Sequence, residues 1–123
     1  MRVLNPGPGE VVDRLTIVAR KIVEGKEKAE HFHKEMEELF HWWENRSFGE
    51  VNEGFAKAAY LLAAVNAALW QLEDKVREFR EGRPPGTADF SQLAFRIQQL
   101  NDRRAELVKE INAQYGVVRE EKL

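Results

Sequence analysis

Apolar residues recur at alternating steps of four and three along three long stretches of this chain. The first stretch runs from Val11 to Trp43, the second from Val51 to Phe79 and the third from Phe90 to Ile111. Such spacing places the apolar residues on one side of an α-helix, and a mean step near 3.5 residues favours left-handed, nearly antiparallel packing. The pattern therefore predicts an all-α protein.

Turn-forming residues divide the chain at segments 5–9, 45–47 and 82–86 and at Gly116. The apolar period continues through Gly25 without a change of phase, whereas a helix–turn–helix would normally reset it. One continuous helix is therefore predicted there, and a hinge or break at Gly25 is the alternative. Short connections then give an up-down-up bundle of three long helices. These helices are expected at about residues 10–44, 48–81 and 90–115.

The second of these helices has signals at both ends and an apolar middle. Ser47 with Glu50 forms a capping-box pattern, and Gly82 suits the position after a helix end. Between residues 59 and 70 the helix is apolar on nearly every side except at Asn66. Such a helix packs through more than one face. We therefore expect it to be central, and we expect a second copy of the chain to complete the packing as a homodimer.

The composition excludes several classes of protein. The chain has 123 residues and a mass of 14.3 kDa, which fits a single helical domain with short irregular segments at 1–8 and 117–123. It has no cysteine, which excludes disulfides, thiolate metal sites and thiol catalysis. Its 19 basic and 21 acidic residues argue against a nucleic-acid partner. Because it has no apolar run of about 18 residues and no signal peptide, we expect a cytoplasmic protein without a membrane partner.

Polar residues at core-facing positions mark the candidate ligand-binding site. Arg104 lies on the third apolar stretch, and Asn66, Glu73 and Arg77 follow a line beside the apolar stripe of the second helix. With tight connections and a helical rise of about 1.5 Å per residue, these groups come together at one end of the bundle. The predicted network consists of Asn66, Trp70, Glu73, Asp74, Asn101 and Arg104, with Asp13 and Arg77 at its outer end.

Three interpretations of this network are open. A buried charge needs a partner, so Arg104 can pair with Glu73 or Asp74 and fix the register of the helices. Alternatively, the network binds an anionic or polyhydroxyl ligand, with the Arg104 guanidinium as a bidentate donor and Trp70 as a flat face. In the third interpretation, Arg104 extends to solvent.

Three segments carry motifs that matter for comparison with other proteins: GEVVDRLTI at 9–17, VNAALWQLEDKVR at 65–77 and LNDRRAELVKEIN at 100–112. Together with the closing segment 120–122, they resemble an uncharacterised family of small helical proteins of bacteria and phages. Members occur alone or beside tetratricopeptide and glycosyltransferase modules. The resemblance implies a helical fold, a recurrent set of polar residues and a context near sugar transfer, and it implies no catalytic residue. Residues 26–55 match no motif of that family.

The sequence identifies no catalytic residue and implies no cofactor. Its lead hypothesis is a non-enzymatic helical module that binds a second copy of itself, another protein or a small polar ligand. The alternative is a magnesium-dependent hydrolase of nucleotides or nucleotide-sugars, because clustered carboxylates can hold magnesium. The carboxylates available for this role are Glu35, Glu38, Glu73 and Asp74.

Aromatic residues gather near the end of the first apolar stretch. They are Phe40, Trp42 and Trp43, and only Trp43 lies on the apolar stripe. The cluster fits either a hydrophobic plug under the following turn or a contact patch for a partner.

Overall fold

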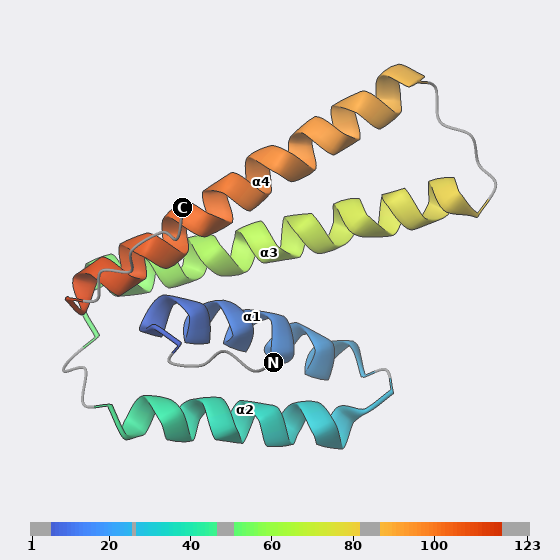
Figure 1. Ribbon diagram of the computed structural model, residues 1–123. Helices are drawn as coiled ribbons and strands as arrows, with labels where there is room; N and C mark the ends of the chain where they lie inside the picture. The colour runs from blue at the N-terminus through green and yellow to red at the C-terminus, as the bar shows by residue number, and fades with distance from the viewer. Residues whose placement is uncertain (1–5, 26, 47–50, 82–86, 117–123) are drawn as a thin grey trace.

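The computed structural model describes residues 6–25, 27–46, 51–81 and 87–116, and in these ranges every regular element is an α-helix. The helices are α1 (Pro8–Glu24), α2 (Ala29–Glu44), α3 (Glu53–Arg80) and α4 (Thr87–Gln114). Consecutive helices run in opposite directions (Figure 1). The all-α prediction is confirmed, whereas the prediction of three long helices is wrong, since the first of them is divided in two.

The division falls at Gly25. This residue has φ 64°, in the left-handed region, and its N–H donates to the carbonyl of Ile22, which ends α1. After the turn, α2 folds back along α1, and the four residues of the predicted apolar stripe in this part of α2 are half-buried: Phe32, Met36, Leu39 and Trp43. The apolar residues thus keep the same spacing before and after the turn, because the stripe of α2 packs against α1 in the helical hairpin. Periodicity alone could not distinguish this hairpin from one long helix.

The other helix ends depend on local capping. α1 begins at Pro8, where a missing N–H costs nothing, and the Glu10 carboxylate accepts from Gly7 N at 2.6 Å. α3 begins at Glu53, and the side chain of Asn52 accepts from Phe55 N at 2.7 Å. The predicted capping box of Ser47 and Glu50 and the predicted cap at Gly82 lie outside the described residues. The predicted stop at Gly116 is confirmed by its φ of 72° just after α4.

The central helix of the bundle is α1. It packs against each of the other three helices, α3 packs along α4, and α2 packs along α1 (Figure 1). The expected central position of the second long helix is therefore wrong: α3 is covered by α1 and α4, and its outer side is left open. The buried apolar side chains nearly all come from the predicted stripes: Val11, Val12, Val18, Ala58, Leu62, Leu69, Leu93, Leu100, Leu107 and Ile111.

Candidate functional site

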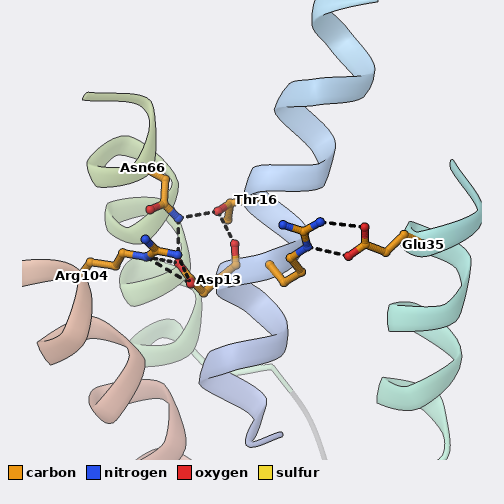
Figure 2. A network of polar contacts seen from close by, with 6 residues as sticks. Asp13, Thr16, Glu35, Asn66 and Arg104 are labelled. Carbon is orange, nitrogen blue, oxygen red and sulfur yellow. Dashed lines mark hydrogen bonds and ion pairs between the residues drawn. The ribbon is translucent and has the colours of Figure 1, made fainter. Parts of the chain in front are cut away.

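The Asp13 carboxylate joins three helices at the middle of the bundle (Figure 2). From α4, Arg104 donates to it through Nε, at 2.9 and 3.1 Å from the two oxygens, and through Nη2 at 2.6 Å. From α3, Asn66 donates through Nδ2 to Asp13 Oδ1 and to Thr16 Oγ, each at 2.8 Å. The Thr16 hydroxyl in turn donates to the Asp13 carbonyl at 2.8 Å. We call Asp13, Thr16, Asn66 and Arg104 the Asp13 cluster.

The residues that make these contacts are largely buried. Asn66 is buried, and the side chains of Asp13 and Arg104 are 15% and 33% exposed. The hydrogen bonds from Arg104 to Asp13 raise the pKa of this guanidinium against the effect of burial, and the charges of Asp13 and Glu73 raise it further. The arrangement is a charge-assisted clamp between helices. It pairs the carboxylate with donors, and the Thr16 hydroxyl donates to the Asp13 backbone carbonyl instead of to the carboxylate.

The predicted partner of Arg104 is wrong, since Asp13 takes the place expected for Glu73 or Asp74. The cause is the turn at Gly25. A continuous first helix would run antiparallel to α3 and carry Asp13 toward the level of Arg77. With the turn, α1 runs in the same direction as α3 (Figure 1), and Asp13 comes to the level of Asn66.

The structure does not gather the rest of the predicted network into one group. Trp70 is half-buried, and the Arg20 guanidinium lies 5.4 Å from the centre of its ring. Asp74 and Arg77 form an ion pair within α3 at the surface. Glu73 and Asn101 are exposed, and Glu73 influences Arg104 only through its charge.

The sequence did not lead us to predict a second group of polar contacts, at the start of α1. Buried Asn112 of α4 accepts from Gly9 N at 2.7 Å through Oδ1 and donates to Glu10 Oε1 at 2.9 Å through Nδ2. Together with Thr16, these residues lie inside the motifs at 9–17 and 100–112. Their position inside these motifs was the signal that could have revealed them. Polar residues next to an apolar stripe can form hydrogen bonds between helices.

Arg14 and Glu35 link α1 to α2. Arg14 donates through Nε at 2.5 Å and through Nη2 at 2.8 Å to the two oxygens of Glu35. The two side chains are 20% and 12% exposed. These hydrogen bonds from Arg14 hold the pKa of Glu35 below its usual value of 4.5, although burial acts in the opposite direction.

This shift predicts acid sensitivity. Because the pKa of Glu35 is lower in the folded than in the unfolded state, the pair stabilises the fold above about pH 4.5 and loses this effect as the pH falls through the folded-state pKa. We expect Glu35→Gln to lower the free energy of urea unfolding at pH 7. The difference from the wild type should shrink toward pH 3, and a difference independent of pH would contradict the assignment.

The residues of the hydrolase hypothesis lie apart. Glu35 and Glu38 are on α2, whereas Glu73 and Asp74 are on α3, and these two helices do not pack along one another. Among the described residues, no group of three or more His, Asp or Glu side chains is placed to hold a metal ion. The four carboxylates therefore do not form one cluster in the described part of the chain.

The aromatic cluster lies where α2, α3 and the end of α4 meet. The ring centre of Trp43 is 5.6 Å from that of Phe55 and 5.7 Å from that of Tyr115, and burial raises the pKa of Tyr115. Beside these rings is an open apolar pocket of about 200 Å³, lined by Val12, Leu15, Phe40, Trp43, Val51 and Phe55. Trp43 thus acts as a plug, whereas Phe40 is 51% exposed at the rim.

Comparisons of the chain with protein families, with curated proteins and with solved structures give no match. Within the described ranges, α3 is the helix long and apolar enough to cross a membrane, with a mean hydropathy of 1.2 over its most apolar window. Length and composition alone do not distinguish a spanning helix from the core helix of a soluble protein. Only 22% of that window is buried inside the bundle.

Proposed function

We propose that this protein is a non-enzymatic helical interaction module that works as a homodimer through the outer side of α3. The observation that carries the proposal is the uncovered apolar middle of this helix. Tyr60 is 79% exposed and Leu61 is 39% exposed, and Ala63 and Ala64 beside them are also exposed. Exposed apolar surface of this kind is typical of sites where proteins associate.

The charges along α3 favour a second copy as the occupant. The outer face of α3 is a line of exposed residues at helical spacing: Glu53, Lys57, Tyr60, Ala64, Gln71, Lys75 and Glu78. Glu53 and Lys75 lie equally far from Ala64 along the helix. In an antiparallel pair of α3 helices centred on Ala64, Glu53 of each copy would face Lys75 of the other. Opposite charges would then flank an apolar centre.

The Asp13 cluster supports this proposal indirectly. Its carboxylate is bonded within the chain by donors from α3 and α4, so it holds α3 in place against α1. A fixed α3 presents its outer face without the cost of ordering it on binding. We also propose that the chain is related to the family of small bacterial and phage helical proteins that it resembles. This relation implies a helical scaffold and no catalytic residue.

The test is the association state of the full chain, measured by light scattering during gel filtration and by sedimentation. We expect a concentration-dependent dimer. Tyr60→Glu should weaken association on the order of 100-fold or more, because it buries a charge in the interface without a partner. Helicity by circular dichroism should be unchanged, because Tyr60 is 79% exposed in the single chain.

The matched control is Phe95→Glu, since Phe95 of α4 is 62% exposed and lies off the outer face of α3. We expect this variant to dimerise like the wild type. A wild-type chain that stays monomeric at all concentrations overturns the proposal, and so does self-association that Tyr60→Glu does not weaken. Cosedimentation of the chain with phospholipid vesicles, abolished by Tyr60→Glu, would assign the face to a membrane instead.

A further inference from the structure

The apolar pattern of α1 and α2 is compatible with two conformations, a helical hairpin and one continuous helix. The apolar stripe is in phase from Val11 to Trp43, as it would be in a single helix, yet the chain turns back between α1 and α2. A sequence that satisfies both arrangements can adopt either, provided that the same apolar and polar groups find partners in each.

The turn itself disfavours the hairpin. Lys28 has φ 68°, and among the described residues it is the non-glycine residue with positive φ. A side chain in the left-handed region is strained, whereas the same residue in a continuous helix is not. Gly25 acts in the opposite direction, since glycine adopts its φ of 64° easily and weakens a helix interior. The two residues thus act on the turn in opposite directions.

Opening the turn would free α1 as one unit. Its buried side chains Val11, Val12 and Val18 pack in the core. Its polar contacts with the other helices are Asp13 to Arg104, Asp13 to Asn66, Gly9 to Asn112 and Arg14 to Glu35. None of the sixteen residues of α2 is fully buried, and its half-buried side chains face α1. A second copy of the chain offers an identical docking site for α1, and exchange of an identical element preserves every one of these contacts.

We propose that two copies exchange α1, with residues 8–44 of each opened into one helix at Gly25, so that each α1 docks on α2, α3 and α4 of the other copy. Both long helices would then run antiparallel and cross near Gly25, where the absence of a side chain permits close approach. This exchange does not use the outer face of α3, so it stands or falls separately from the proposed function.

A charge-reversed pair tests the exchange directly. Arg14→Glu gives a chain with two acidic residues at the link of α1 and α2, and Glu35→Arg gives a chain with two basic ones. Each variant alone should melt below the wild type. After both are mixed and annealed, an exchanged heterodimer restores an opposite pair at both links. We expect heterodimers to exceed homodimers about tenfold by native mass spectrometry, with the melting temperature raised above that of either variant.

Heterodimers and homodimers in statistical proportions, with no gain in melting temperature, would overturn the exchange and leave association through the outer face of α3 intact. A mixture that stays monomeric would overturn the exchange as well. Where both proposals hold, exchanged pairs associate further through the outer face of α3, and Tyr60→Glu reduces that assembly to the exchanged pair. Loss of the association through α3 in Tyr60→Glu therefore reports on the proposed function alone, so the two failures are distinguishable.

A second pair of variants changes only the turn. Gly25→Ala strains the hairpin and favours the helix, and a Cβ there has open space, since the nearest atom is 4.0 Å away. With two turns per dimer, we expect the association constant to rise on the order of 100-fold. Lys28→Gly relieves the strain in the hairpin and should lower the association constant by a similar factor. Equal association of these two variants would contradict the proposal.

Discussion

Replacing Gly9 with alanine should destabilise the protein by about 3 kcal/mol, and lower its melting temperature by roughly 10 °C, because the added methyl has no room. A Cβ on Gly9 would lie 2.2 Å from the backbone carbonyl oxygen of Val108. Backbone cannot move aside as a flexible side chain can, so α1 and α4 would have to separate. Separation also breaks the buried bond from Gly9 N to Asn112 Oδ1. Urea unfolding measures the loss.

Gly54→Ala is the matched control. Gly9 and Gly54 each occupy the second position of a helix, in α1 and α3. The neighbours of a Cβ on Gly54 are side-chain atoms of Gln114 and Asn52, at 3.2 and 3.3 Å, which can shift. We expect this variant to be as stable as the wild type or slightly more stable, since alanine favours a helix over glycine. Equal losses at both positions would show that the gap between α1 and α4 is not responsible.

The helices could be predicted because their apolar stripes carry the packing information locally. Leu62, Leu69 and Leu107 are buried where the step of four and three placed them. The turn at Gly25 could not be predicted in the same way, because its evidence is a single backbone conformation. A glycine costs little in the left-handed region, and only about 1 kcal/mol within a helix. Neither cost decides the outcome from the sequence alone.

The site depended on that turn. Asn66 and Arg104 were both members of the predicted network, and both bond to one carboxylate. The identity of that carboxylate was missed because Asp13 is 91 residues from Arg104, and its level follows from the direction of α1. An error at one turn therefore moved a site residue from the centre of the network to its far end. Local periodicity contains no information about such a reversal.

Removing the Asp13 carboxylate should cost about 3 kcal/mol in Asp13→Ala, since Arg104 and Asn66 then lose their acceptor in a largely buried place. The estimate is at the low end for a broken buried pair because the Arg104 side chain is 33% exposed. Asp74→Ala is the control, for it removes an exposed partner of Arg77 within one helix. That change should cost less than about 0.5 kcal/mol.

The double variant separates a structural clamp from a ligand site. If Asp13 chiefly holds Arg104, Asp13→Ala combined with Arg104→Met should be less destabilising than the sum of the single variants by about 2 kcal/mol, because no charge is left without a partner. Urea unfolding of the four proteins gives this coupling energy. A coupling near zero, with Asp13→Ala as stable as the wild type, would contradict the clamp. It would return Asp13, Asn66 and Arg104 to the ligand-binding interpretation, since binding residues can be removed without unfolding the scaffold that carries them.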